Sequence, residues 1–280
     1  MECPGKQCLG MARRAALKGC AMLKFWVPLL AVTGLAGFVM FNARVEPPSA
    51  AHAAQAASPA ALTPSTAGPV VAELFTSQGC SSCPPADAVA ARLARDPAIL
   101  VISRPVTYWD RLGWKDSLGR EENTRLQRQY GDKAFAGANI YTPQLVVDGR
   151  AQAVGSQEAK VRSLLATVAV ARRKSGLSVR IAAAGMGKQV MLDGAGGQQA
   201  ELVLVALASG RTVSIGAGEN GGRKVHYTNV VLAERNLGAW TGGAQTVTIT
   251  PDMLRVAGAD RHALLVRQGP GGPVIGSAVI

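Results

Sequence analysis

The feature that most constrains the fold of this chain is a pair of cysteines placed between two different secondary-structure patterns. Residues 70–75 (VVAELF) are rich in β-branched and large apolar residues and are followed by turn-forming residues, which predicts a buried strand. Residues 85–95 (PADAVAARLAR) are rich in alanine and carry proline in the first turn, which predicts a helix. Cys80 and Cys83 lie between these patterns. A C-x-x-C pair is therefore expected where a buried strand ends and a helix begins.

The patterns that follow continue the alternation of strands and helices. The expected elements are strands at residues 99–103, 144–147 and 151–154, and helices at residues 121–130 and 156–174. Asp148-Gly149 predicts a hairpin turn between the last two of these strands. The resulting order is strand, helix, strand, helical insert, strand, strand, helix, which is the plan of a thioredoxin-like α/β domain.

From residue 177 the sequence changes to short β-rich runs separated by glycine-rich breaks. About eight such runs favour an all-β, sandwich-like portion, although the same strands could instead extend the first sheet. The predicted fold is therefore an α/β thioredoxin-like core with a C-terminal all-β portion. The expected parts are a signal or anchor segment at residues 1–44, an Ala/Pro-rich tether at 45–69, a thioredoxin-like domain at 70–175 and a β-rich domain at 176–280.

The N-terminal segment predicts export of the chain. Basic residues between positions 13 and 24 precede the apolar run 25–41, an arrangement typical of a signal peptide or of an uncleaved signal anchor. The run is intermediate in length between a signal-peptide core and a full membrane span. We expect a periplasmic or other extracytoplasmic location, with attachment to the inner membrane through residues 25–41 if the segment is not cleaved.

The charge of the chain does not indicate a nucleic-acid partner. The formal net charge is +12, of which residues 1–68 supply +4 and the remaining residues +8. The basic residues are dispersed, and their longest run, at 172–174, falls at the end of a predicted helix, where cations interact favourably with the helix dipole. No basic motif interleaved with aromatic residues is present. A generally basic surface without nucleic-acid binding is expected.

The cysteine pair allows three kinds of site. A thiol at a helix N-terminus is favoured as a thiolate, so Cys80 is a candidate exposed nucleophile and Cys83 a candidate shielded, resolving thiol. A structural zinc site needs four ligands, and the sequence supplies no second C-x-x-C and no paired histidines. Two thiolates alone could hold Cu(I), and an exported pair could also be a passive disulfide. No cofactor is expected.

Other candidate site residues follow from the predicted plan. Thr142-Pro143 directly precedes the strand at 144–147, the place where a cis-proline faces the dithiol and the neighbouring backbone pairs with substrate in the thioredoxin plan. Glu73 lies seven residues before Cys80, where a buried acid with a raised pKa could exchange a proton with the resolving thiol; alternatively, it faces solvent at a strand edge. Tyr108 and Trp109 could form an apolar wall for a peptide substrate, or pack as a lid or core.

Four blocks of sequence resemble the exported thioredoxin-like proteins of domain-of-unknown-function family 1223. The blocks are FTSQGCSSCPPAD (residues 75–87), YWDRLGWKD (108–116), YTPQLVVDGR (141–150) and IGAGENGGRKVHYTNVV (215–231). The resemblance covers about residue 70 to the C-terminus. It implies a thioredoxin-like core that carries a C-terminal β portion, and it implies no established activity.

The chain departs from this family in one block. Where members read like SFHVDYWD, this chain reads SRPVTYWD, so that Arg104, Pro105 and Thr107 replace Phe, His and Asp. Any help that the His and Asp give to thiol chemistry or metal binding is then lost. Arg104 could instead provide a cation near the dithiol.

These observations favour a thiol–disulfide oxidoreductase that acts through Cys80 and Cys83 on protein thiols or disulfides. The alternative is a non-catalytic thioredoxin-fold module that binds a partner protein or Cu(I), and a third hypothesis is a structural envelope protein with a passive disulfide. The sequence leaves open whether the chain is an enzyme, and in which direction electrons flow.

Overall fold

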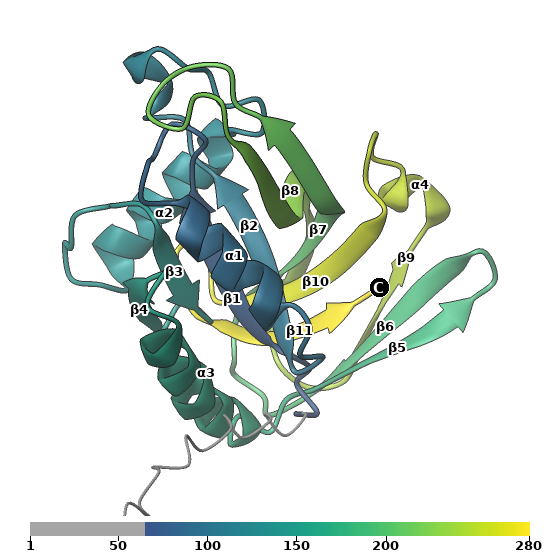
Figure 1. The fold of residues 1–280 in the computed structure, drawn as a ribbon. Helices are drawn as coiled ribbons and strands as arrows, with labels where there is room; N and C mark the ends of the chain where they lie inside the picture. The colour runs from purple at the N-terminus through teal and green to yellow at the C-terminus, as the bar shows by residue number, and fades with distance from the viewer. Residues whose placement is uncertain (1–64) are drawn as a thin grey trace, which may run out of the picture. The chain divides into compact units, whose positions relative to one another are not determined.

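The computed structural model describes residues 65–280, and the expected signal or anchor segment and most of the expected tether lie outside this range. The described part is a mixed α/β structure with one large sheet, one small sheet and few helices (Figure 1). Its elements in chain order are β1 (Val70–Thr76), α1 (Pro84–Leu93), β2 (Ile99–Pro105), the short 3₁₀ helix η1 (Asp110–Leu112), α2 (Glu121–Lys133), β3 (Gln144–Val147), β4 (Ala151–Val154), α3 (Glu158–Arg173), β5 (Ser178–Ala184), β6 (Gly187–Asp193), β7 (Ala200–Ser214), β8 (Lys224–Trp240), β9 (Gln245–Ile249), α4 (Pro251–Leu254), β10 (Arg261–Arg267) and β11 (Val274–Val279).

The large sheet has eight strands in the order β11-β10-β7-β8-β2-β1-β3-β4. β1 pairs in parallel with β2 and antiparallel with β3, and all of its residues are buried. β8 pairs antiparallel with β7 over most of its length and touches β2 in parallel where Val230 lies opposite Ser103. The strand that leads into the cysteine pair is therefore held on both sides in the interior of the sheet.

The large sheet curls until β11 lies against the beginning of β1 (Figure 1). The amide of Ser277 donates a hydrogen bond to the carbonyl oxygen of Ala67 at 2.9 Å, and the amide of Val274 donates to that of Asp148 at 2.9 Å. Since side chains alternate between the two faces of a strand, the curl gives the sheet an inner and an outer face. The inner face is filled by Val71, Leu100, Ile102, Val203, Val205, Leu207, Val231, Ala263, Leu265 and Val274.

Two layers cover the outer face. Helices α1 and α3 cover β1, β2 and β3 through a core that includes Leu74, Val101 and Leu165. The three-stranded sheet β5-β6-β9 covers β7, β10 and β11 through a core that includes Leu192 and Trp240. Helix α2 packs on the other face of the N-terminal strands. Both faces of the sheet are thus buried along most of its width.

The C-terminal strands do not form the separate unit predicted for residues 176–280. β7, β8, β10 and β11 complete the sheet of the N-terminal part, and β5, β6 and β9 form the small sheet. Two of the predicted runs, residues 200–208 (AELVLVALA) and 211–215 (RTVSI), were separated at Gly210 but belong to one strand, β7, because its pairing with β8 continues through Gly210 opposite Thr228. Extension of the first sheet, the alternative considered above, therefore describes most of these strands.

The last residues of the predicted tether belong to the folded structure. Thr66 Oγ1 donates a hydrogen bond to the carbonyl oxygen of Leu177 at 3.1 Å. Gly68 has a φ of +83°, and a Cβ at this position would lie 1.7 Å from the carbonyl oxygen of Ser277. The segment from residue 65 is therefore fixed against β5 and β11, and the folded part begins before residue 69.

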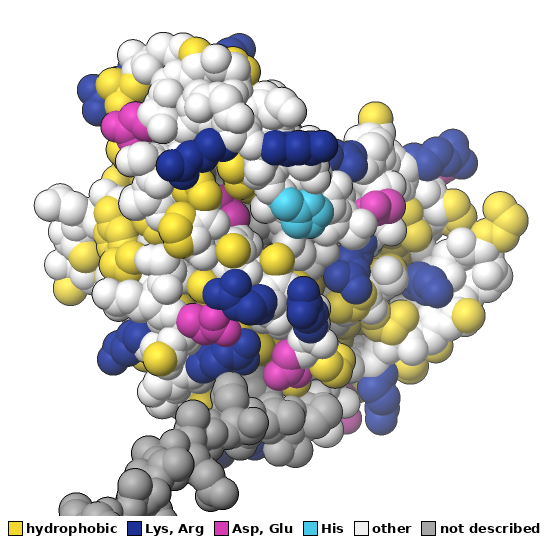
Figure 2. Space-filling model, viewed as in Figure 1, with side chains coloured by type: hydrophobic (Ala, Val, Ile, Leu, Met, Phe, Trp, Pro, Cys, Tyr) yellow, Lys and Arg dark blue, Asp and Glu magenta, His cyan; other side chains and the backbone are white. Residues whose placement is uncertain are grey.

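Basic side chains are spread over the surface rather than gathered in one patch. Figure 2 shows Lys and Arg side chains across the visible face, with acidic and hydrophobic side chains between them. Among the helices of residues 65–280, none has both the length and the apolar character needed to span a membrane.

Candidate functional site: the cysteine pair and its surroundings

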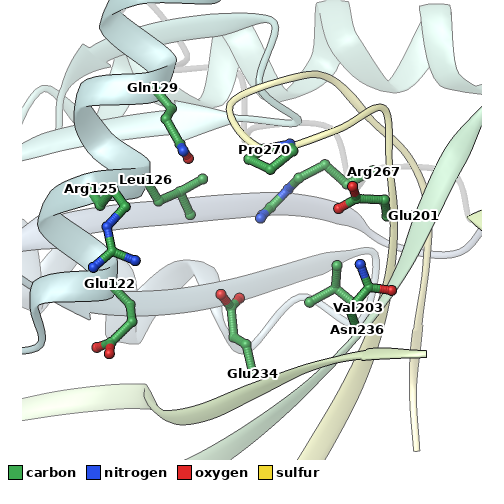
Figure 3. Close-up of a pocket in the computed structure, with 10 residues that line it drawn as sticks. All are labelled: Glu122, Arg125, Leu126, Gln129, Glu201, Val203, Glu234, Asn236, Arg267 and Pro270. Atoms are coloured by element: carbon green, nitrogen blue, oxygen red, sulfur yellow. The ribbon is translucent and has the colours of Figure 1, made fainter. Parts of the chain in front are cut away.

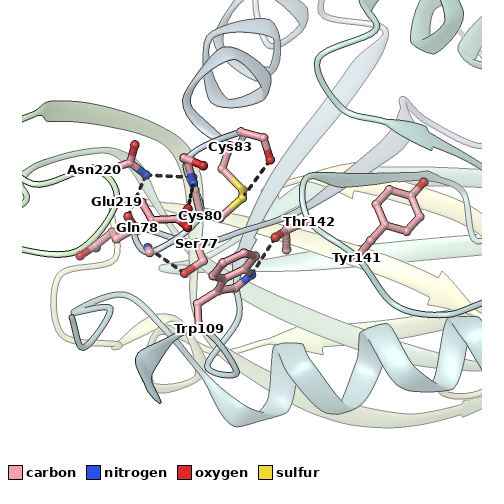
Figure 4. Close-up of a disulfide and its surroundings, with 12 residues drawn as sticks. Ser77, Gln78, Cys80, Cys83, Trp109, Tyr141, Thr142, Glu219 and Asn220 are labelled. Atoms are coloured by element: carbon pink, nitrogen blue, oxygen red, sulfur yellow. Dashed lines mark hydrogen bonds between the residues drawn. A yellow bond between two sulfur atoms is a disulfide. The ribbon is translucent and has the colours of Figure 1, made fainter. Parts of the chain in front are cut away.

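Cys80 and Cys83 form a disulfide at the junction of β1 and α1 (Figure 4). Their Cα atoms are 5.4 Å apart, and Cys83 is the N-cap residue of α1. The exposed fraction is 1% for Cys80 and 0% for Cys83. The pair lies between strand and helix as predicted, but the prediction of an exposed Cys80 is wrong because neighbouring segments cover both residues.

The backbone at the start of α1 has few N–H groups available to stabilise a thiolate. Pro84 and Pro85, the first two residues of the helix, have no N–H group. The amides of Ala86 and Asp87 both donate to the carbonyl oxygen of Cys83, at 2.8 and 3.1 Å. The Cys83 side chain accepts no capping hydrogen bond. The stabilisation that we expected from unpaired N–H groups at this helix end is therefore not provided here.

The loop between β7 and β8 holds the cysteine loop in place (Figure 4). Asn220 Nδ2 donates hydrogen bonds to the carbonyl oxygens of Gln78 at 2.9 Å and of Cys80 at 2.8 Å. Glu219 Oε2 accepts a hydrogen bond from the amide of Ser81 at 3.0 Å. Hydrogen bonding from Ser81 lowers the pKa of Glu219, which keeps this carboxylate charged. We call this loop, residues 218–222, the clasp; our sequence analysis missed it, although it lies in one of the four family-like blocks.

Two buried aspartates lie near the cysteine loop. Asp87, in the first turn of α1, is 2% exposed, and neither of its carboxyl oxygens has a hydrogen-bond partner in the described structure. Burial, together with the charge of Asp116, raises the pKa of Asp87 well above its usual value. Asp116 Oδ2 accepts a hydrogen bond from the amide of Gln78 at 2.8 Å, and burial raises its pKa as well. This side of the disulfide is therefore unfavourable for negative charge.

Thr142 and Trp109 lie beside the disulfide (Figure 4). The Thr142-Pro143 peptide bond is cis. Trp109 Nε1 donates a hydrogen bond to Thr142 Oγ1 at 2.8 Å. A Cβ at Gly79 would lie 3.1 Å from the Cβ of Trp109, so the tryptophan also touches the cysteine loop. The structure brings these predicted site residues together, with Trp109 placed between the two loops.

The other aromatic residues of this region are packed against the core. Tyr108 contacts the cluster of Phe75 and Val106, and its buried hydroxyl has no hydrogen-bond partner in residues 65–280. Burial raises the pKa of Tyr108. Trp114 Nε1 donates a hydrogen bond to Gln78 Oε1 at 2.9 Å, and its ring packs against Gly216, next to the clasp. The contacts of Tyr108 correspond to the lid or core that we considered for it.

Glu73 is not placed as a proton carrier for the dithiol. It lies on the inner face of β1, wholly buried, and its Oε1 accepts hydrogen bonds from Arg104 at 2.6 Å and from Arg267 at 2.8 Å. Tyr130 donates to its other oxygen. Burial alone would raise the pKa of Glu73, but the charges of Arg267 and Arg104 and the hydrogen bonds from Tyr130 and Arg104 outweigh it and lower the pKa. The prediction that Glu73 has a raised pKa is therefore wrong, and so is the alternative that it faces solvent at a strand edge.

Arg104 supplies no cation to the disulfide. Its buried guanidinium also donates to Glu234 at 2.6 Å and to Asn123 at 3.2 Å, so all of its charge interactions lie inside the curled sheet. Pro105 and Thr107, the other two departures from the family pattern, form hydrogen bonds with α2. The expectation of a cation near the dithiol at position 104 is wrong, because residues 100, 102 and 104 alternate onto the inner face of β2.

A cavity of about 280 Å³ opens beside this buried ion cluster (Figure 3). Arg267 from β10 and Glu234 from β8 both point into it. The lining residues are Glu122, Arg125, Leu126, Gln129, Glu201, Val203, Glu234, Asn236, Arg267 and Pro270. None of them contacts the cysteine loop, so the cavity is separate from the dithiol site. In the part of the chain that the structure describes, no cluster of three or more His, Cys, Asp or Glu residues could hold a metal ion.

Comparison with known proteins gives a family and a fold. The family model described as "Protein of unknown function (DUF1223)" matches residues 71–267. A protein from Agrobacterium tumefaciens, solved as a structural genomics target, is similar over 78% of this chain and 95% of its own, with 27% identity and a TM-score of 0.67. HBP35 of Porphyromonas gingivalis is similar in fold over 78% of this chain and 76% of its own, with 13% identity and a TM-score of 0.50. None of the curated proteins matches the chain.

Proposed function

The chain belongs to the DUF1223 family of proteins of unknown function, and we propose that it is a thiol–disulfide oxidoreductase built on a thioredoxin-like core. The observation that carries the proposal is the Cys80–Cys83 disulfide between β1 and α1, with Thr142 against it. The order β1-α1-β2-α2-β3-β4-α3, with β1 parallel to β2 and antiparallel to β3, supports the thioredoxin-like core.

In the proposed reaction, Cys80 forms a mixed disulfide with a partner protein and Cys83 resolves it. Cys80 adjoins the exposed residues Ser81 and Ser82, and its sulfur lies 3.3 Å from the hydroxyl of Ser82, whereas Cys83 is fixed at the base of the helix. A partner thus reaches Cys80 first. Thr142 and Pro143 then shape the groove for an extended segment of the partner, with Tyr108 and Trp109 as its apolar wall.

Asp87 replaces Glu73 as the proposed proton carrier. Its backbone amide donates to the carbonyl oxygen of Cys83, one helical turn earlier, and helical side chains lean back over the preceding turn. The Asp87 carboxyl oxygens have no hydrogen-bond partner within residues 65–280, and the raised pKa of Asp87 makes its ionised form a stronger proton acceptor. We assign to Asp87 the proton that Cys83 releases when it becomes a thiolate.

Turnover requires the cover over the disulfide to move. Trp109 is held by Thr142, and the clasp is held by the hydrogen bonds of Glu219 and Asn220 to the cysteine loop. Side chains that contact a loop by only one or two hydrogen bonds each can separate at small free-energy cost. We propose that partner binding displaces Trp109 from Thr142.

The test is reduction of insulin disulfides by the full-length chain with dithiothreitol as the electron source. We expect turnover above the background rate, and we expect Cys80→Ser and Cys83→Ser each to abolish it. A Ser81→Ala variant, which keeps both thiols, serves as the matched control and should retain the activity. Absence of turnover in the wild-type chain, or equal turnover in the cysteine variants, would contradict the proposed function.

The burial of both cysteines favours a second candidate function, a non-catalytic binding module with a passive disulfide. Cys83 has no exposed surface and Cys80 almost none. In this case the wild-type chain and a chain carrying both Cys→Ser substitutions would capture the same partner protein, and neither would reduce insulin. For either function we propose an extracytoplasmic location, since disulfides persist in oxidising compartments.

A further inference from the structure

The hydrogen bonds of the cysteine loop determine how well this site can hold a thiolate. Besides the two prolines that lack N–H groups, the amides of Gln78 and Ser81 are bound by the carboxylates of Asp116 and Glu219. The amides of Cys80 and Cys83 donate to the carbonyl oxygens of Ser77 and Cys80. Most backbone N–H groups of the loop are therefore already bound by other acceptors, and the hydroxyl of Ser82, 3.3 Å from the Cys80 sulfur, remains a donor within reach of it.

The charges around the loop also disfavour a thiolate. Asp87, Asp116 and Glu219 surround the cysteine loop, and within residues 65–280 none of the three forms a salt bridge with Lys, Arg or His. Arg104, the arginine of β2, forms salt bridges with Glu73 and Glu234 instead. A thiolate at Cys80 or Cys83 would thus add negative charge to a site whose acidic groups form no salt bridge within residues 65–280.

We propose that the Cys80–Cys83 pair is an electron donor that reduces disulfides of partner proteins, and that it is a poor oxidant. This inference rests on the proposed function. The physical link is the stability of the reduced form. A dithiol whose thiolate is well stabilised makes its disulfide a strong oxidant, and a dithiol without that stabilisation returns readily to the disulfide. Most backbone N–H groups of the loop are bound elsewhere, and the nearby carboxyl groups form no salt bridge within residues 65–280, so this pair belongs to the second class.

The reaction then balances as follows. The Cys80 thiolate attacks one sulfur of the partner disulfide, forms a mixed disulfide and releases the other partner sulfur as a thiolate. Cys83 gives its proton to Asp87, and its thiolate attacks the Cys80 sulfur. The second partner sulfur leaves as a thiolate, and two electrons have passed from the dithiol to the partner. The resulting Cys80–Cys83 disulfide must be reduced again by a protein dithiol of still more reducing character.

Two substitutions test the origin of this preference. Pro85→Ala restores an N–H at the second helical position, where it can donate to the side chain of the N-cap residue Cys83. Glu219→Gln removes one negative charge but keeps an oxygen that can accept from Ser81. Glu122→Gln, on the exposed surface of α2, is the matched control for the loss of one acidic charge.

The measurement is the equilibrium between the full-length chain and glutathione redox buffers, read by trapping free thiols. We expect the wild-type pair to stay oxidised in a buffer of mostly reduced glutathione and to be reduced by dithiothreitol. The equilibrium constant for reduction should rise about 3- to 10-fold for Pro85→Ala and about 2- to 5-fold for Glu219→Gln. Glu122→Gln should leave it unchanged.

The outcomes separate this inference from the proposed function. Both proposals are supported if the chain reduces insulin, the wild-type glutathione equilibrium is as expected, and the two variants shift it as expected. A chain that oxidises reduced protein thiols faster than it reduces insulin keeps the oxidoreductase function and overturns the inference. Unchanged equilibria in both Pro85→Ala and Glu219→Gln also overturn it. A chain that exchanges electrons in neither direction contradicts the proposed function itself.

Discussion

The buried position of Asp87 should affect how the free energy of unfolding depends on pH. Its pKa is raised in the folded state by burial and by Asp116, whereas in the unfolded chain it should be near the usual value of about 3.9. Below that value both states hold the proton. As the pH rises, the unfolded chain releases its proton first, so the folded state loses stability until folded Asp87 also ionises. Asp87 therefore lowers the free energy of unfolding at neutral and alkaline pH.

We predict that Asp87→Asn increases the free energy of unfolding by about 1–3 kcal/mol at pH 8. The increase should disappear below about pH 4, where Asp is protonated in both states. Urea denaturation across this pH range measures the difference. Asp132→Asn, at an exposed position on α2, is the control and should show no such trend. A wild-type stability that rises between pH 5 and 8 relative to Asp87→Asn would contradict the prediction.

Substitution of Arg104 should lower the stability of the fold without changing the redox equilibrium of the disulfide. Arg104→Met removes the partner of Glu73 and Glu234 and leaves a wholly buried carboxylate with one arginine fewer. We predict a loss of about 3–5 kcal/mol in the free energy of unfolding. The glutathione equilibrium of the folded variant should stay within about twofold of wild type, because the guanidinium is not at the disulfide. Arg128→Met, at a largely exposed site, controls for loss of a cation.

Among the elements, the clasp is the one whose removal should expose the disulfide. Asn220→Ala deletes two hydrogen bonds to the cysteine loop. We predict that dithiothreitol reduces the disulfide of this variant at least about threefold faster, because the loop opens more often. The free energy of unfolding should fall by about 1–3 kcal/mol. Gln199→Ala, at an exposed position before β7, should change neither quantity. Equal reduction rates would show that the clasp does not control access.

Elements defined by local sequence were predicted closely. β3 and β4 have the predicted bounds, because Asp148 and Gly149, both with positive φ, form the turn that sets their register. β7 was divided in two because Gly210 was interpreted as a break, whereas the long antiparallel partner β8 keeps the strand continuous. Pairing with a distant strand is a tertiary effect that a local pattern does not contain.

The site shows the same division between local and distant information. The placement of the cysteine pair after a buried strand follows from residues within one short segment. The partners of that segment do not: Asn220 lies 140 residues from Cys80, and Arg267 lies 194 residues from Glu73. Sequence patterns gave no reason to connect these residues, so the role of Glu73 was assigned wrongly and the clasp was missed.

At the scale of the whole molecule, the inner face of the curled sheet joins the N-terminal and C-terminal parts. The inward positions of β1 continue from Val71 to Glu73, and those of β10 continue from Leu265 to Arg267. The apolar layer and the ion cluster are therefore successive layers of one interior. Trp240 and the small sheet close the outer face of β7, β10 and β11, and α1 and α3 close that of β1. Folding of the cysteine segment thus depends on strands contributed by the C-terminal part.

This dependence predicts that residues 65–175 do not fold on their own. Without β8 the strand β2 has a free edge, without β10 the buried Glu73 loses Arg267, and the apolar inner face of β1 is exposed to water. We expect the fragment to show no cooperative urea transition and a collapsed amide region in its ¹H–¹⁵N spectrum, whereas residues 65–280 unfold cooperatively. A dispersed spectrum and a cooperative transition for residues 65–175 would instead establish an independent N-terminal domain, with the boundary near residue 175 that the sequence indicated.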